Sequence, residues 1–419
     1  DDRSTVMTRF RSCGHCARQP LGAVWLVLLL TAPLARSQVP AQLGFDDRPS
    51  PPPTPANLPS VPSATLSTPR AAEATSAEVI QAGCAGCGAL PNPAGKLFGG
   101  CHCGGGKCVP GREACSPCCH EGVVGRFLCE LYQCFCCPDP CYDPRWLPVA
   151  DAAFFTDAAR PVTQMRLRYD AGVNLILPDR AEFFWARADG SGKGPKPPPP
   201  AIAENRLNYN DISLYTEAAT GRVGVFVETP YRSIDPDVVP HAAGFGDMNL
   251  GIKTLMLDCE LLQVSFQMRT YIPVGNFFKG TGNGHMSLEP SLIFGLRVCE
   301  DTFLQAQVGE WIPLGGDPSY SGAILRYNFS LNQVLCRILP DVPLLGTLEL
   351  NGYSFQHGAY TDPVFGSFQK AGDDGYLYVG AGLRLVVCDK IDIGFATSFA
   401  VTDQHFADQI YRTEFRWRF

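Results

Sequence analysis

From about residue 163 to the end of the chain, apolar and polar residues alternate one by one over long runs. In one run, Val264, Phe266 and Met268 alternate with Gln267 and Arg269. This period of two is typical of a β-strand with one apolar and one polar face. The runs last about 10 to 14 residues, whereas strands of soluble domains average about 5 to 6 and a tilted strand needs about 9 to 11 residues to cross a bilayer. The pattern predicts an all-β fold, an antiparallel up-and-down transmembrane β-barrel.

Short and long connections alternate between these runs, as in bacterial outer-membrane barrels. Short turns are expected at 220–221, 258–260, 299–301 and 388–390, and longer loops at 174–206, 274–284, 314–321, 354–375 and 402–409. About twelve strands are expected within 163–419, starting near residues 163, 207, 222, 245, 260, 285, 301, 322, 343, 376, 389 and 408. An even number puts both ends of the barrel in the periplasm. The competing interpretation is a soluble sandwich or lipocalin-like barrel, and the strand lengths argue against it.

Aromatic residues lie on one face of the last expected strand. Tyr411, Phe415, Trp417 and Phe419 resemble the C-terminal signal that the barrel-assembly machinery of bacteria recognises. This interpretation implies an outer-membrane location and two partners, outer-membrane lipid and the assembly machinery.

The first 37 residues have the parts of a secretory signal peptide. Basic residues such as Arg9 precede an apolar stretch at 24–30, and Ala35-Arg36-Ser37 carries small residues at the cleavage positions. No run of roughly 18 or more apolar residues is present, so no transmembrane helix is expected. Removal of residues 1–37 on export would leave the region ahead of the barrel in the oxidising periplasm.

The composition changes twice between the signal peptide and the barrel. Residues 38–82 are rich in Pro, Ser and Ala and are expected to be a disordered linker. Residues 83–146 hold 13 of the 19 cysteines and few aliphatic residues, so this irregular segment needs covalent or metal cross-links. Residues 147–162 are expected to connect it to the barrel.

Two kinds of cross-link remain open for the cysteine-rich segment. Disulfides suit an exported protein, and cysteine doublets depart from clean zinc spacing. A metal site is the weaker alternative, with these candidate ligands: Cys84, Cys87, Cys115, Cys118, His102 and His120. No cofactor is expected. Because 13 is an odd number, at least one of these cysteines pairs outside the segment, pairs with another chain or stays unpaired.

Four further cysteines lie at the ends of expected barrel strands: Cys259, Cys299, Cys336 and Cys388. Around the loop at 274–284, the numbers of opposite residues in an antiparallel pair add up to about 558, and Cys259 with Cys299 satisfies this sum. We predict the disulfides Cys259–Cys299 and Cys336–Cys388 on the periplasmic rim, where neighbouring strands come within disulfide distance. The alternative is four unlinked cysteines at strand ends.

If the apolar faces contact lipid, the polar faces line the lumen. The pore-lining candidates are Lys253, Arg269, Tyr271, Glu289, Arg297, Arg326, Glu349, Arg384, Asp392, Arg412 and Glu414. The two signs of charge are nearly balanced, so these groups either line a weakly selective hydrated pore or close the interior through ion pairs. The loop at 174–206 contains Phe183, Phe184 and Trp185. It is expected to lie on the surface, and the alternative is that part of it folds into the mouth as a constriction.

Two classes of function find no support. The net charge of −7 gives no reason to expect nucleic acid as a partner. The histidines of the barrel region fall in loops or at strand ends and form no recognisable catalytic arrangement. The chain is therefore not expected to be an enzyme.

Two stretches carry a pattern known from one barrel family. Residues 244–254 read Gly-Phe-Gly-Asp-Met-Asn-Leu-Gly-Ile-Lys-Thr, and residues 271–295 contain Tyr-Ile-Pro-Val-Gly, Gly-Thr-Gly-Asn-Gly and Ser-Leu-Glu-Pro. Over about residues 207–419, the chain resembles the outer-membrane barrel family named for the meta-cleavage pathway of phenol degradation. The resemblance implies a channel for small aromatic or hydrophobic molecules. The cysteine-rich segment lies outside the usual pattern of this family.

The sequence is compatible with two functions. The first is an outer-membrane channel or transporter for small solutes, aromatic or amphipathic ones among them. The second is a structural anchor, in which the barrel presents the disulfide-bonded or metal-binding segment to the cell wall or to a periplasmic protein.

Overall fold

The structure is a computed structural model that describes residues 148–187, 192–201, 203–259 and 261–419. The predicted signal peptide, linker and cysteine-rich segment, including the candidate metal ligands, lie outside the described residues. Within the described ranges, no helix is both long enough and apolar enough to cross a membrane.

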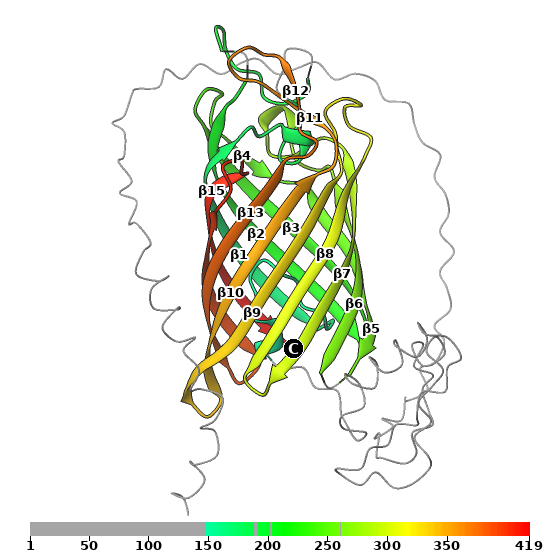
Figure 1. Ribbon diagram of the computed structural model, residues 1–419, viewed down its shortest axis with the longest axis vertical. Coiled ribbons are helices and arrows are strands. Elements are labelled where there is room, and N and C mark those ends of the chain that lie inside the picture. Colours follow the sequence, from blue (N-terminus) through cyan, green and yellow to red (C-terminus); the bar gives the residue numbers. More distant parts are fainter. Residues whose placement is uncertain (1–147, 188–191, 202, 260) are drawn as a thin grey trace, which may run out of the picture. The chain divides into compact units, whose positions relative to one another are not determined.

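Twelve long antiparallel strands form a closed barrel (Figure 1). They are β1 (Gln164–Ile176), β2 (Arg206–Thr220), β3 (Val223–Pro236), β5 (Met248–Asp258), β6 (Leu262–Ile272), β7 (Met286–Cys299), β8 (Thr302–Leu314), β9 (Ile324–Leu339), β10 (Val342–Phe355), β13 (Gly375–Val387), β14 (Ile391–Ala400) and β15 (Ala407–Arg418). Strand β1 closes the ring by pairing with β15, from Gln164 opposite Arg418 to Leu175 opposite Ala407. The predicted fold class is confirmed, and each long strand begins within three residues of its predicted start.

The described part of the chain also contains short strands and 3-10 helices outside the twelve long strands. Strand β4 (Ala242–Phe245) pairs with β3 ahead of β5, and β11 (Ala359–Thr361) and β12 (Phe368–Lys370) form a small separate sheet. The 3-10 helices are η1 (Pro148–Asp151), η2 (Arg180–Glu182) and η3 (Phe277–Lys279). The short turns gather at one end of the barrel, here called the turn end, and the long loops at the other, the loop end (Figure 1).

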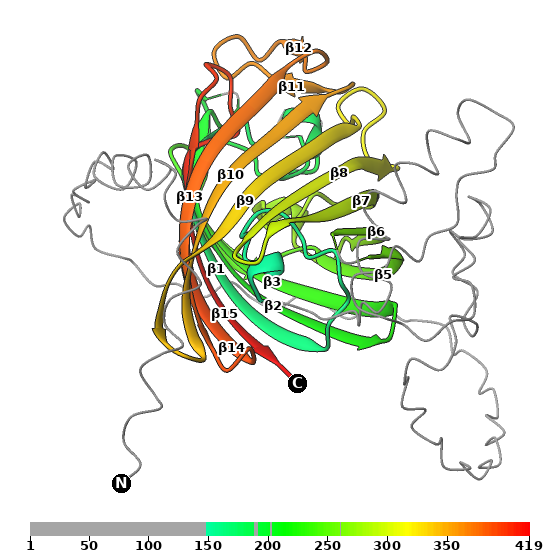
Figure 2. The same ribbon diagram turned by 60° about the horizontal axis from the view of Figure 1, so that its bottom comes forward.

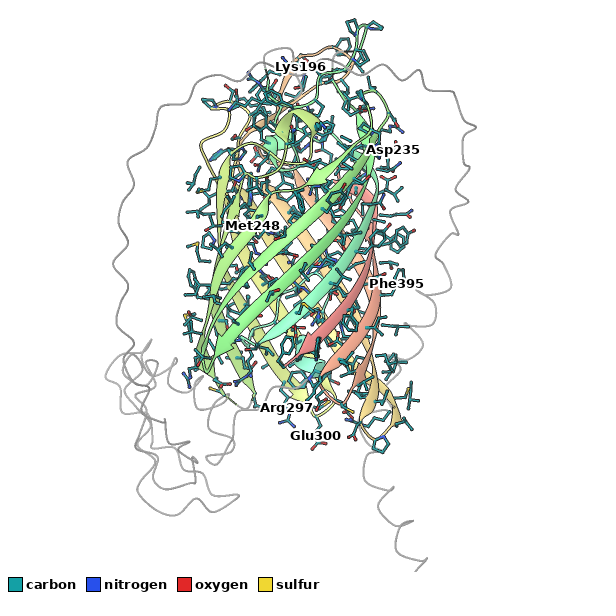
Figure 3. All side chains as sticks on the ribbon, turned by 180° about the vertical axis from the view of Figure 1, so that it is seen from behind. Lys196, Asp235, Met248, Arg297, Glu300 and Phe395 are labelled. Atoms are coloured by element: carbon teal, nitrogen blue, oxygen red, sulfur yellow. The ribbon has the colours of Figure 1, made fainter. Side chains whose placement is uncertain are left out.

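The barrel wall separates apolar from polar side chains. On β1, Leu167 is 48% exposed, whereas the neighbouring Arg166 faces inward and is buried. Phe395 points away from the wall at about mid-height (Figure 3) and is also exposed. Lipid, rather than water, is the solvent that covers an apolar belt of this kind on a closed barrel. Closure also removes the strand edges that a bilayer does not tolerate.

The structure corrects the predicted bond between Cys259 and Cys299. The register is as predicted, since Leu262 of β6 lies opposite Leu296 of β7. Cys259, however, precedes β6 and lies in a turn that its own N–H closes by donating to the Leu262 carbonyl (3.0 Å). Cys259 is disulfide-bonded, but Cys299 is not its partner.

The predicted bond between Cys336 and Cys388 is also wrong, because both residues are exposed free thiols. Cys336 of β9 lies opposite Leu344 of β10, which in turn lies opposite Leu385 of β13. A whole strand therefore separates the two cysteines. Two strand spacings of about 4.8 Å each exceed the Cα separation of about 4.4–6.8 Å that a disulfide allows.

Candidate functional site

The connector between the cysteine-rich segment and β1 lies inside the barrel. Residues 148–160 are largely buried and run within the ring of strands, where Figure 2 shows them in teal. The N–H of Phe155 donates to the Glu349 carboxylate (2.9 Å), and Asp157 accepts a hydrogen bond from Arg269 (2.8 Å). The connector therefore fills the lumen toward the turn end.

A cluster of buried ion pairs holds the beginning of the connector. Its members are Arg384, Arg416, Arg418, Asp151, Asp392 and Glu414. Asp392 lies 2.5 Å from Arg384 and 2.5 Å from Arg418, while Arg416 pairs with Asp151 of η1 at 3.0 Å. The three positive and three negative charges cancel, which is the condition under which ionised groups can be buried together.

Residues 177–187, which directly follow β1 and are here called loop 1, fold into the loop end of the lumen. Trp185 is fully buried and Phe184 is 5% exposed, and the ring of Phe183 packs edge-on against Trp311 (5.5 Å between centroids). Part of the loop at 174–206 therefore lies in the mouth, which is the alternative to its expected surface location. Consecutive aromatic side chains are unfavourable in water, and rings inside the mouth offer them a packed apolar surface.

Polar contacts fasten loop 1 to the loops around it. Arg187 pairs with Asp317 at 2.6 Å, and Arg180 pairs with Asp374. The carboxylate of Glu182 in η2 lies 3.4 Å from Nδ1 of His285, just before β7. Loop 1 is thus held by side chains and is not part of the strand pairing of the wall.

Two ionisable groups at the loop end are shifted by burial. Burial lowers the pKa of the His285 imidazole below its ordinary value, although Glu182 acts in the opposite direction. His285 is therefore neutral at pH 7. Burial also raises the pKa of the Asp247 carboxyl, against the effect of the backbone N–H groups of Asn283 and Gly275 that donate to it.

A cavity of about 250 Å³ remains between the connector and loop 1. Phe155 of the connector and Phe183 and Phe184 of loop 1 contribute to its lining. The barrel and its other loops add five aromatic residues, namely Tyr209, Tyr271, Trp311, Tyr353 and Phe406. The charged lining consists of Arg168, Arg232, Arg269, Arg326, Arg412, Asp170, Asp211, Glu228 and Asp247. Aromatic and charged groups therefore share the lining of one cavity.

Ion pairs and ring contacts organise the charged lining. Arg412 pairs with Asp170 (2.7 Å), and its guanidinium lies 4.2 Å from the ring centroid of Phe155. Arg232 lies 3.9 Å from the ring centroid of Phe184 and likewise pairs with an aspartate. Cation–π contacts of this kind hold charge and aromatic surface side by side.

The predicted pore-lining residues fall into three groups in the structure. Arg269, Tyr271, Arg326 and Arg412 line the cavity. Lys253, Glu349, Arg384, Asp392 and Glu414 are buried in ion pairs or in hydrogen bonds to the connector. Glu289 accepts hydrogen bonds from Arg326 and Tyr271, and Arg297 lies at the turn end (Figure 3).

Sequence reasoning missed the residues that close the lumen. Phe155 and Asp157 fall in the expected connector, where only the run Ala152-Ala153-Phe154-Phe155 signals an apolar segment that needs burial. Phe183 and Phe184 lie in a loop for which the sequence favours the surface over a constriction in the mouth. The signal that could have found them is three consecutive aromatic residues in a loop.

The aromatic residues of the last strand share its outward face. Phe415 and Trp417 are exposed, and the rings of Trp417 and Phe419 lie 4.7 Å apart. Tyr411 stacks with Phe395 of β14. Their role as an assembly signal stays a prediction.

No protein-family model matches this chain, and no curated protein matches it. Among solved structures, it is similar to the NanC porin, with 10% identity, a TM-score of 0.36 and coverage of 61% of this chain and 100% of that one. A COG4313 outer membrane channel from Pseudomonas putida F1 has 11% identity, a TM-score of 0.38 and coverage of 62% and 96%. A FadL homologue from Pseudomonas aeruginosa has 9% identity, a TM-score of 0.28 and coverage of 62% and 90%. Similarities with identities and TM-scores this low carry no weight for function.

Proposed function

We propose that this chain is an outer-membrane channel for small amphipathic solutes, closed at rest by the connector and by loop 1. The observation that carries the proposal is the cavity of about 250 Å³ between these two closures. The exposed apolar belt supports a bilayer location for the barrel. The resemblance of residues 207–419 to the meta-pathway barrels supports a channel for small molecules.

Passage of a solute requires both closures to move while the wall stays intact. Loop 1 is held by ring stacking and by ion pairs such as Arg187 with Asp317, and the connector is held by contacts such as Phe155 with Glu349. Neither segment is a strand of the wall. Segments held by side-chain contacts open at a lower free energy than the paired core of a fold.

Liposome swelling tests this function with small sugars and amino acids as solutes. Full-length mature protein should raise the swelling rate above that of empty liposomes. The variant F183A/F184A removes the rings that hold loop 1 in the mouth, so its swelling rate should rise several-fold further. F365A is the matched control, because Phe365 lies between β11 and β12 and is 78% exposed; it should behave like the wild type.

Insertion of each protein can be verified by its heat-dependent mobility on SDS gels. Swelling rates equal to those of empty liposomes for both the wild type and F183A/F184A, with insertion verified, would remove the channel proposal.

Swelling rates no higher than those of empty liposomes would favour the second candidate function, a structural anchor. The observation behind it is the disulfide bond of Cys259 at the turn end, whose partner is none of the other cysteines in the described residues. A disulfide at the rim suits a barrel that holds a periplasmic module in place.

A further inference from the structure

The charged residues that line the cavity have satisfied acceptors but unused hydrogen-bond donors. Every carboxylate that lines the cavity already accepts hydrogen bonds from described residues: Asp170, Asp211, Asp247 and Glu228. Two of the lining arginines, Arg232 and Arg412, use all three of their guanidinium nitrogens as donors. The lining carboxylates are thus satisfied by the protein itself.

Arg326 and Arg269, by contrast, have donors to spare. Among the described residues, Arg326 donates only from Nη1, to both oxygens of Glu289 at 2.9 Å and to Tyr271. In the same part of the chain, Arg269 donates only from Nη2, to Asp157. The Nε of each arginine is buried without a hydrogen-bond partner among the described residues. The side chain of Arg326 is 20% exposed and that of Arg269 is 10% exposed. Because both side chains point inward and line the cavity, they are exposed to the cavity.

Tyr271 brings these two arginines to one corner of the cavity. It is the next inward-facing residue after Arg269 on β6, and its hydroxyl lies 3.5 Å from Nη1 of Arg326. Unused guanidinium N–H groups bind carboxylates in a planar, bidentate manner. Donors that are removed from water without a partner are unfavourable until an acceptor reaches them. The corner is therefore suited to a small anion.

Aromatic rings lie next to this corner. The guanidinium of Arg326 is 5.6 Å from the ring centroid of Tyr353. Phe183 meets Tyr353 at 6.2 Å and Phe406 at 5.6 Å, both in edge-on geometry. At about 250 Å³, the cavity is smaller than the roughly 300–1,000 Å³ typical of pockets for drug-sized ligands. It therefore has room for a molecule with a single ring.

We propose that the cavity binds a small aromatic carboxylate, with its carboxylate at Arg269 and Arg326 and its ring against Phe183, Tyr353 and Phe406. The proposal rests on the channel function, since it names the class of solute that the cavity selects. A neutral aromatic molecule leaves the spare donors without an acceptor, and a small anion without a ring leaves the aromatic lining uncovered. Each should bind more weakly.

Calorimetric titration of the full-length mature protein in detergent micelles tests this inference. Benzoate is the probe, benzyl alcohol the neutral aromatic comparison and acetate the anion without a ring. Benzoate should bind at least about tenfold more tightly than benzyl alcohol, because a hydrogen bond to a charged group contributes about that factor or more. It should also bind more tightly than acetate, because its ring buries apolar surface that acetate lacks.

Paired substitutions separate recognition from folding. R326Q/E289Q removes the guanidinium without leaving the carboxylate of Glu289 unpaired, so benzoate affinity should fall about tenfold or more while that for benzyl alcohol stays the same. R337Q is the matched control on the same strand, since Arg337 is 55% exposed and pairs with Asp301 outside the cavity. R326K is a second variant that keeps the charge beside Glu289 but loses the planar fork, and it should also weaken benzoate alone.

Two results would overturn the inference. One is benzoate binding no tighter than benzyl alcohol binding; the other is wild-type benzoate affinity in R326Q/E289Q or, if that variant does not fold, in R326K. The channel function fails separately, through the swelling assay. Solute flux without selective benzoate binding would leave a channel of different selectivity, whereas absence of flux in the wild type and in F183A/F184A would remove the channel itself.

Discussion

The side chain of Asp392 shows how the barrel interior accommodates charge at the scale of one residue. Its carboxylate is fully buried and lies within 2.5 Å of both Arg384 and Arg418. Removing one member of a buried ion-pair cluster leaves the opposite charges without compensation, which typically costs about 3–5 kcal/mol. An exposed pair contributes about 0–1 kcal/mol, because water screens it.

Asp392→Asn should therefore lower the free energy of unfolding by about 3–5 kcal/mol, measured by urea titration in lipid vesicles with tryptophan fluorescence as the signal. Asp301→Asn is the matched control, since Asp301 is 41% exposed in its pair with Arg337; its effect should stay below about 1 kcal/mol. Equal losses for the two variants would show that the cluster is hydrated rather than buried.

His285 links loop 1 to pH. Because burial lowers the pKa of its imidazole in the folded protein, the folded state binds fewer protons than the unfolded chain between the two pKa values. Stability from this site is fully present above the ordinary pKa of about 6.5 and decreases as the pH falls below it. The charged groups that act on His285 are Glu182 and Asp247, which favour its protonation, and Lys193, which opposes it.

Thermal unfolding of the wild type and of His285→Gln should be compared from about pH 7.5 down to pH 5. The melting temperature of the wild type should decrease more steeply, and the difference between the two proteins isolates His285. Asp247 contributes with the opposite sign, because its raised pKa makes folding more favourable as the pH falls, and it is the same in both proteins. Parallel curves would mean that His285 stays hydrated.

At the scale of strands, the sequence predicts what depends on local periodicity. Each long strand begins close to its predicted residue because the lipid-facing and lumen-facing residues must alternate along it. The register of β6 with β7 was also predictable, since a single loop fixes which residues lie opposite each other, as Leu262 and Leu296 do. The inward side of Arg269 and Arg326 follows from the same alternation.

The segments without periodicity were predicted poorly. Residues 148–160 and loop 1 enter the lumen because the polar inner face offers partners such as Glu349 and Arg269, and no local pattern in the sequence encodes a partner on a distant strand. The cysteine pairs failed for a related reason. Cys299 is not the disulfide partner of Cys259, and β10 lies between Cys336 and Cys388. The height of a residue along the barrel axis can be predicted from the turns. Its neighbours on adjacent strands can be predicted only when the order and register of all strands are known.

At the scale of the whole molecule, the arrangement of polar and apolar groups is the reverse of a soluble domain. Inward residues such as Ser265, Arg384 and Glu414 are fully buried and polar, while outward residues such as Leu167 and Ile393 are apolar and exposed. The connector and loop 1 complete the interior by supplying hydrogen-bond partners and rings. This arrangement is stable only if lipid covers the outside.

A charge on the outer face distinguishes lipid from water around the belt. Phe395 is 50% exposed and lies at about mid-height of the wall (Figure 3). Phe395→Arg should lower the free energy of unfolding in lipid vesicles by about 2–4 kcal/mol, the cost of an arginine near the centre of a bilayer. Phe365→Arg, in the loop between β11 and β12, should change it by less than about 0.5 kcal/mol, as exposed substitutions usually do. If both variants unfold at the same urea concentration as the wild type, water surrounds Phe395 and the barrel does not span a membrane.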